Sequence, residues 1–151
     1  MPIGVPWPPS AAVAEFRRGW NGRFGLTLAI TGPPDQHLRG VLHLGLTAPE
    51  AVEVSYGVAP QHRGQGLATR AVRLAEPWVF AQVPATRVEI VVAAGGVHGL
   101  ASRRVAENAG FFYATRRCSH AAATGAQYDD PVYVLAASGP IPTDPAPSAE
   151  A

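Results

Sequence analysis

The apolar pattern of this chain changes its period at a short glycine-rich segment, residues 61–66. Before the segment, apolar residues alternate with small or polar ones in three runs, 24–30, 38–46 and 51–58. This alternation predicts strands with one buried face. After the segment, apolar residues recur at helical spacing over 66–80, which predicts an amphipathic helix. Three strands that lead through a glycine-rich junction into a helix constrain the chain to a sheet with helices packed on it.

Further periodic segments extend this pattern on both sides. An N-terminal helix at 11–20 would begin after Ser10, and the helix that follows the junction should kink or end near Pro77. Later, the pattern predicts a strand, a helix that ends at Gly110 and two last strands: 88–92, 101–109, 111–117 and 127–135. Pro131 favours an edge position or a bulge in the last strand. Together these elements predict an α+β fold, or a mixed α/β sheet.

Length and proline distribution predict the domain organisation. A chain of 151 residues allows one ordinary domain. Proline clusters at both ends predict a proline-rich arm at 1–9, a single domain at 10–137 and a disordered tail at 138–151. No apolar run approaches the ~20 residues of a membrane span. The first residues do not resemble a signal peptide either, so we expect a cytoplasmic protein without membrane contact.

Composition excludes several classes of partner. All 12 basic residues are arginines and 11 residues are acidic, so the net charge of +1 argues against a nucleic-acid partner. The single cysteine, Cys118, excludes an intramolecular disulfide framework. His98, Cys118 and His120 fit no common metal-binding spacing, so no metal is predicted.

The glycine-rich segment itself predicts an anion site. The first turn of the helix that follows it offers unpaired N–H groups and the positive end of the helix dipole. Gly64 and Gly66 let the backbone turn without a side chain in the way, and Arg63 adds a cation. A P-loop is excluded because the chain has no lysine. A dinucleotide fingerprint would need a third glycine where Thr69 stands.

The residues across this junction resemble those of a known family. Gln61-x-x-Gly64-x-Gly66 is similar to the acetyl-CoA signature Arg/Gln-x-x-Gly-x-Gly/Ala of the GCN5-related N-acetyltransferases, abbreviated GNAT. The flanking segments resemble in particular the ribosomal-protein N-acetyltransferase-like branch of that family: 53–58, 66–71, 101–111 and 127–135. The resemblance runs from residue 24 to residue 135.

The resemblance implies a fold, a cosubstrate and a reaction. The fold would be a central, mostly antiparallel and twisted sheet flanked by helices. Acetyl-CoA would be the cosubstrate, and the enzyme would move its acetyl group to a primary amine by direct attack. The acceptor would be a protein N-terminus or a small-molecule amine. By resemblance, the cofactor-binding residues are Tyr56, Gly57, Val58, His62, Arg63, Gly64, Gln65, Gly66, Leu67, Ala68, Gly99 and Ser102.

Each part of that set has an implied role. The backbone amides of 62–68 would hold the CoA pyrophosphate, and the edge of the strand at 56–58 would pair with pantetheine. A backbone N–H near Val58 would polarise the thioester carbonyl, where a donor is useful because charge develops as the amine attacks.

Glu53 and Ser102 are the candidate catalytic residues. Glu53 lies in the strand that leads to the loop and could act as the general base, or it could be an ordinary solvated carboxylate. Many family members have a tyrosine general acid at the position of Ala106, and this branch often has a serine at the position of Ser102. Ser102 would then donate a proton to the thiolate, or it would only cap or pack at the helix start. Tyr113 and Tyr133 are fallback donors.

The sequence departs from the family pattern at two further places. Gly99 stands where the branch usually has an asparagine that contacts CoA, although His98 beside it could offer a side-chain bond. We also expect the family's first strand and helix, which would precede 11–20, to be missing. A partner subunit or the proline-rich arm would then complete the acceptor site, or the site would be open. An exposed N-terminal sheet edge favours a homodimer. These departures support a second hypothesis, a catalytically degenerate acyl-CoA-binding or scaffolding module.

Overall fold

The computed structural model describes residues 25–32, 35–94, 98–121 and 123–137. The predicted helix at 11–20 with Ser10, the arm at 1–9 and the tail at 138–151 lie outside the described residues. Within them, the elements in chain order are β1 (Gly25–Thr31), β2 (Leu38–Ala48), β3 (Ala51–Val58), the 3₁₀ turn η2 (Pro60–His62), α2 (Leu67–Gln82), β4 (Arg87–Val91), α3 (Gly99–Asn108), β5 (Phe112–His120) and β6 (Gln127–Ala136). The order of strands and helices predicted between residues 24 and 135 is confirmed.

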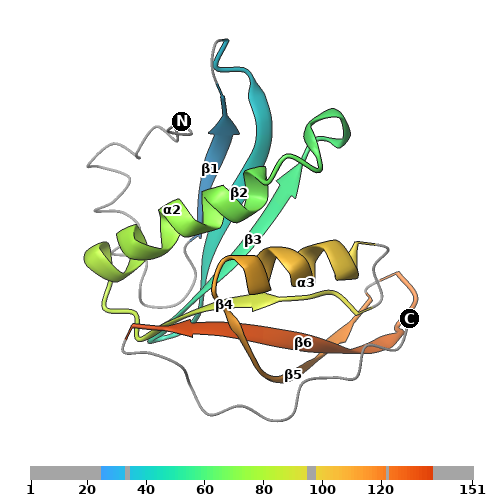
Figure 1. Ribbon diagram of the computed structural model, residues 1–151. Helices are drawn as coiled ribbons and strands as arrows, with labels where there is room; N and C mark the ends of the chain where they lie inside the picture. Colours follow the sequence, from blue (N-terminus) through green and yellow to red (C-terminus); the bar gives the residue numbers. More distant parts are fainter. Residues whose placement is uncertain (1–24, 33–34, 95–97, 122, 138–151) are drawn as a thin grey trace.

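The six strands form a single sheet in the order β1-β2-β3-β4-β6-β5 (Figure 1). All neighbouring pairs are antiparallel except β3 and β4, which are parallel. This arrangement confirms the predicted mostly antiparallel α+β sheet. The parallel pairing is short, because it runs from Ala51 opposite Arg87 only as far as Glu53 opposite Glu89. Beyond that pair the two strands diverge and leave an opening in the sheet (Figure 1).

Helices α2 and α3 lie on the same face of the sheet (Figure 1). The apolar stripe of α2 is buried through Leu67, Ala71, Val72, Ala75 and Val79. These side chains join one core with the alternate residues of the strands, among them Leu44, Val54 and Ile90. Full burial of one such side chain stabilises the fold by about 1.5–3 kcal/mol, so this face fixes the position of α2 against β3.

The end of α3 follows the sequence prediction closely. Gly110 has a φ of 90°, the left-handed conformation that glycine adopts without steric cost. The amide of Gly110 donates to the carbonyl of Glu107, and the amide of Phe111 donates to the carbonyl of Ala106. This pair of bonds is a Schellman motif, which satisfies the last carbonyls of the helix.

One alternative of each expectation about proline is wrong. Helix α2 does not end near Pro77 but continues to Gln82. Pro77 is exposed, and so is Arg73, the residue whose carbonyl loses its helical partner, which lowers the cost of the break. Pro131 does not lie in an edge strand, because β6 has β4 and β5 on its two sides. The paired residues of β4 and β6 end at Val132, however. Pro131 comes just before that position, so its missing N–H costs the pairing no hydrogen bond.

Candidate active site

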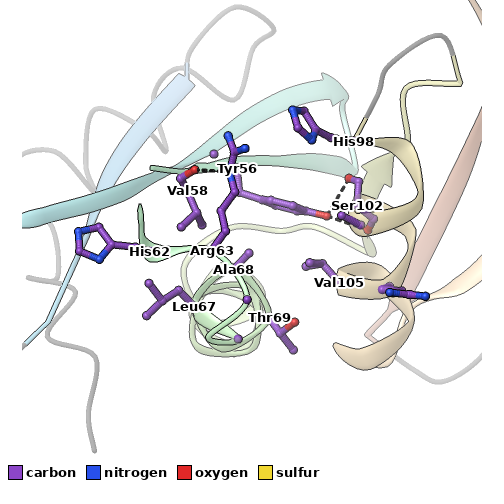
Figure 2. Close-up of a pocket in the computed structure, with 15 residues that line it drawn as sticks. Tyr56, Val58, His62, Arg63, Leu67, Ala68, Thr69, His98, Ser102 and Val105 are labelled. Carbon is purple, nitrogen blue, oxygen red and sulfur yellow. Dashed lines mark hydrogen bonds between the residues drawn. The ribbon is translucent and has the colours of Figure 1, made fainter. Parts of the chain in front are cut away.

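A cavity of about 370 Å³ lies where β3 ends, between the start of α2 and the first turns of α3 (Figure 2). Its walls therefore come from three elements that the fold brings together beside the opening in the sheet. The lining residues are Tyr56, Gly57, Val58, His62, Arg63, Gly64, Gly66, Leu67, Ala68, Thr69, His98, Ala101, Ser102, Arg104 and Val105.

The glycine-rich loop forms the wall at the start of α2. Gly64 and Gly66 have φ values of 74° and 71°, a conformation that side-chain-bearing residues rarely adopt. A Cβ placed on either glycine would meet no atom of the described chain within 4 Å, so the space beside them is open. Gly66 is the N-cap residue of α2, and no described side chain caps the helix. The first amides of α2 are therefore available to an anion.

Two arginines hold the loop in this conformation by binding its carbonyl groups. The Nε atom of Arg63 donates to the carbonyl of Val58 at 3.0 Å (Figure 2). The Nη2 atom of Arg70 donates to the carbonyl of Gln65 at 2.9 Å. One bonded carbonyl is at the end of β3 and the other is in the loop, so both guanidinium groups lie close to the loop. Open space, free amides and the charge of Arg63 in the cavity lining fit the pyrophosphate of a nucleotide-bearing thioester such as acetyl-CoA.

The opposite wall is joined to β3 by Tyr56. Its hydroxyl lies 3.0 Å from the Oγ atom of Ser102 and 3.0 Å from the carbonyl oxygen of Ser102 (Figure 2). Burial raises the pKa of the Tyr56 hydroxyl, and the hydrogen bond with Ser102 offsets part of that effect. Tyr56 is therefore a neutral hydroxyl at the junction of β3 and α3.

The other face of the sheet carries an ion-pair network at the point where β3 and β4 diverge. Glu53 and Glu89 are directly opposite each other on these strands. Arg117 on β5 bonds to both, with Nη1 3.2 Å from Glu53 Oε2 and Nη2 2.7 Å from Glu89 Oε2. Arg87 Nε lies 2.8 Å from Glu89 Oε1. Burial raises the pKa of Glu89, but the hydrogen bonds from Arg87 and Arg117 outweigh it and hold that pKa below its ordinary value.

Most of the predicted cofactor-binding residues are brought together by the structure. Ten of the twelve line the cavity: Tyr56, Gly57, Val58, His62, Arg63, Gly64, Gly66, Leu67, Ala68 and Ser102. Gln65 and Gly99 are not among the lining residues. A Cβ at Gly99 would come within 2.9 Å of the Ala93 carbonyl oxygen. The backbone at Ala93 is therefore too close for a side chain at position 99, which explains the glycine. Glu53 lies outside the cavity lining, in the ion-pair network.

Ser102 and the fallback donors also have clear positions. Ser102 lies inside α3, whose N-cap residue is His98, so Ser102 does not cap the helix. Ala106 is fully buried in the core. Tyr113 and Tyr133 pack edge to face with ring centroids 6.0 Å apart, and neither belongs to the cavity lining.

Four of the lining residues were not predicted from the sequence: Thr69, Ala101, Arg104 and Val105. Thr69 belongs to the first turn of α2, and the other three belong to α3. The spacing of Ala101, Arg104 and Val105 places them on one face of that helix together with Ser102. Helical spacing of three and four positions, counted from Ala101 to Arg104 and Val105, was therefore the signal that could have found these three residues.

The part of the chain that the structure describes holds no group of three or more His, Cys, Asp or Glu side chains suited to a metal ion. None of the helices in those residues combines the length and apolar character needed to cross a membrane.

The sheet and the cavity together define a class of protein. A mostly antiparallel sheet that opens between two parallel strands, with a glycine-rich helix start at the opening, is the architecture of a coenzyme A-dependent acyltransferase. The sequence matches the acetyltransferase (GNAT) domain family over residues 1–112, and the chain belongs to this family. The resemblance to this family, carried by the signature at residues 61–66 and the flanking segments, is thereby confirmed. Acetyl-CoA is the cosubstrate of the family.

Solved structures of similar fold agree with this assignment. RimJ from Mycobacterium smegmatis, in complex with CoA-disulfide, is 23% identical, with a TM-score of 0.64 over 85% of this chain and 61% of that chain. Ribosomal-protein-S5-alanine acetyltransferase from Vibrio fischeri is 18% identical, with a TM-score of 0.63 over 83% and 67% of the two chains. The microcin C7 self-immunity acetyltransferase MccE, in complex with acetyl-CoA and AMP, is 18% identical, with a TM-score of 0.64 over 84% and 69%. At these identities the likeness shows the fold alone. Comparison with curated protein sequences gives no match.

Proposed function

We propose that this chain is an N-acetyltransferase that moves the acetyl group of acetyl-CoA to a primary amine by direct attack. The observation that carries the proposal is the cavity at the end of β3, where the open space beside Gly64 and Gly66 meets the amides of α2. Acetyl-CoA supplies the reactive thioester, and the chain supplies the surroundings that hold it. Membership of the acetyltransferase (GNAT) domain family supports the reaction class.

In this proposal the loop residues bind the phosphate groups. The backbone amides from His62 to Ala68 would hold the pyrophosphate, and all of these residues except Gln65 line the cavity. Arg63 would contribute its charge from the same wall. The backbone of Tyr56, Gly57 and Val58 lies where β3 no longer pairs with β4, so its edge is available to pantetheine. A backbone N–H near Val58 would stabilise the negative charge that develops on the thioester oxygen.

We propose Glu53 as the general base for the acceptor amine. It occupies the last paired position before β3 and β4 diverge, and its side chain is 32% exposed. Arg117 holds that carboxylate in one orientation at the opening of the sheet. The acceptor would therefore approach from the face opposite to α2 and α3.

The acceptor we favour is a protein N-terminal amine. The support is the similarity of the motif segments to the ribosomal-protein branch, together with structural neighbours such as the Vibrio fischeri ribosomal-protein-S5-alanine acetyltransferase. A small-molecule amine is the other acceptor class, and a module that binds acyl-CoA without turnover is the other function. The binding module is favoured by one observation: buried Ala106 stands where many family members have a tyrosine that acts as general acid.

Two measurements on the full chain test the proposal. Calorimetric titration with acetyl-CoA should give saturable binding. Release of CoA should then be followed with a panel of peptides that have free N-terminal amines, simple primary amines and polyamines. Turnover with peptides supports our proposal, and turnover with small amines alone changes the acceptor. Binding without turnover would establish the binding module instead, and absence of binding would contradict both functions.

A further inference from the structure

We propose that Tyr56, acting through Ser102, is the source of the proton that the departing CoA thiolate takes up. The inference rests on the function proposed above and names a residue for its last step. Tyr56 is a positioning residue in this scheme, because it acts on the reacting sulfur only through the Ser102 hydroxyl. The two hydroxyls form a two-proton relay that leads from β3 to the cavity.

The donors and acceptors around Tyr56 define two arrangements. The Tyr56 hydroxyl has one proton and two neighbours, the carbonyl oxygen and the Oγ atom of Ser102, each at 3.0 Å. If the proton goes to the carbonyl, which can only accept, Ser102 must turn its own proton toward Tyr56. If the proton goes to Oγ, the proton of Ser102 is free to point into the cavity. Only the second arrangement makes Ser102 a donor to a bound ligand.

A relay also reduces the mismatch in acidity that Ser102 would have alone. An aliphatic hydroxyl is a much weaker acid than a thiol, so a lone Ser102 would end the step as an unfavourable alkoxide. A phenol ionises near pKa ~10 and a thiol near ~8.5, so transfer that begins at Tyr56 is far better matched to the leaving group. Burial raises the pKa of Tyr56, which keeps the donor protonated before the reaction.

The residues around Tyr56 and Ser102 favour these two hydroxyls as the proton relay. Among the described residues that line the cavity, the hydroxyl groups belong to Tyr56, Ser102 and Thr69. Thr69 lies on the α2 wall rather than beside Ser102. Arg63 and Arg104 line the same cavity and bring positive charge to it. His62 and His98 are the other titratable groups of the lining.

The proton and electron count of the step is balanced. After the neutral amine has attacked, the C–S bond breaks and its electron pair goes to sulfur. The Ser102 O–H bond breaks and a new S–H bond forms, while the Tyr56 proton moves to Ser102 Oγ. Tyr56 is left as a phenolate, which takes back from solvent the proton that the acceptor amine released. The products are the acetylated amine and the CoA thiol.

Single-turnover kinetics with saturating acetyl-CoA and a peptide acceptor test the relay. Four variants of the full chain are compared with the wild type: Tyr56→Phe, Ser102→Ala, Ser102→Thr and the double variant Tyr56→Phe/Ser102→Ala. We expect Tyr56→Phe and Ser102→Ala each to lower the rate constant by about 10²-fold, at the lower end of general acid catalysis. The double variant should fall no further, because the two groups act as one unit. Ser102→Thr retains a hydroxyl and should recover most of the rate.

A proton inventory separates the relay from a structural role. A plot of the wild-type rate constant against the D₂O fraction should be curved, because two protons move in the step. The same plot for Tyr56→Phe should be a straight line, because only one proton moves. Tyr128→Phe removes a tyrosine hydroxyl outside the cavity lining and should leave both readouts unchanged. Acetyl-CoA affinity by calorimetry and the melting temperature report whether each variant is folded. If Tyr56→Phe fails to fold, Ser102→Ala and the wild-type inventory carry the test.

Two results would overturn the relay. One is a wild-type rate in the Tyr56→Phe variant, and the other is a linear proton inventory in the wild type. In both cases the wild type still turns over, so the proposed acetyltransferase function would stand. A wild type that binds acetyl-CoA without any turnover would instead contradict the function and the relay together.

Discussion

Arg117 Nη2 on the edge strand β5 lies 2.7 Å from Glu89 Oε2 on β4, so this ion pair reaches across β6. The same guanidinium contacts Glu53 on β3. Glu53 and Glu89 are the last pair of residues that join β3 and β4. Two carboxylates opposite each other on neighbouring strands repel, and the charges of Arg117 and Arg87 together balance them. The ion-pair network therefore joins β3, β4 and β5 at the last position before β3 and β4 diverge.

Replacement of Arg117 by alanine should destabilise the fold. Glu89 is only 4% exposed, and it would lose one of its two cationic partners. We expect the free energy of unfolding to fall by about 1.5–3 kcal/mol, the range for a hydrogen bond to a charged group, because Arg117 itself is partly exposed. Urea unfolding measures the change. Arg116→Ala is the matched control on the same strand, since its contact with Asp129 is a surface pair at 3.6 Å. Equal losses in the two variants would show that the network does not stabilise the sheet.

The stability of the protein should depend on pH through Glu89. Its pKa in the folded state lies below the ordinary value of 4.5, because the bonds from Arg87 and Arg117 outweigh burial. Its stabilisation is therefore complete above that ordinary value and is lost as pH falls through the folded pKa. Glu89→Gln should flatten this acid limb in a series of urea titrations.

Glu76 provides a control of opposite sign. Burial raises the pKa of Glu76 in the folded state above the ordinary value of 4.5. Its contribution to stability therefore falls as pH rises from that ordinary value through the folded pKa. Glu76→Gln should leave the acid limb due to Glu89 in place. An acid limb that survives Glu89→Gln unchanged would contradict the assignment.

Gly66→Ala should weaken acetyl-CoA binding beyond its effect on folding. A Cβ at this left-handed position costs about 1–2 kcal/mol in stability. It would also occupy the open space beside the amides of α2. Gly125→Ala carries the same backbone strain, with a φ of 68°, in the turn before β6. We expect similar losses of stability in both variants and at least a tenfold loss of affinity, about 1.4 kcal/mol, in Gly66→Ala alone. Equal affinities by calorimetry would show that the loop does not hold the nucleotide.

Glu53→Gln should lower turnover more than it lowers acetyl-CoA affinity. The amide keeps the shape of the side chain but cannot take a proton from the acceptor amine, and general base catalysis contributes about 10²–10⁴-fold. The measurement compares kcat with saturating acceptor against the calorimetric Kd. If kcat stays at the wild-type value, Glu53 is a partner of Arg117 with no part in proton transfer.

Local sequence patterns predicted the strands, the helices and the loop. Alternating apolar residues such as Leu42 and Leu44 on β2 determine which face is buried, and Gly110 ends α3, because these effects act within a few residues. The glycines at 64 and 66 were informative for the same reason. Helix α2 passes Pro77 because tertiary packing of its buried face outweighs one lost bond.

Contacts between distant segments could not be predicted in this way. Arg117 and Glu53 are 64 positions apart, and they meet only because β6 lies between β4 and β5. The sequence does not specify that strand order, so Glu89 was not recognised as a buried partner of two arginines. The bond of Tyr56 to Ser102 likewise depends on how α3 packs against the end of β3.

The central claim is transfer of an acetyl group from acetyl-CoA to a free amine. Mass spectrometry tests it most directly on a peptide with a free N-terminal amine, compared with the same peptide whose amine is already blocked. We predict that the free peptide gains one acetyl group for each CoA released, and that the blocked peptide gains none. Binding of acetyl-CoA with no acetylation of any amine would contradict the account.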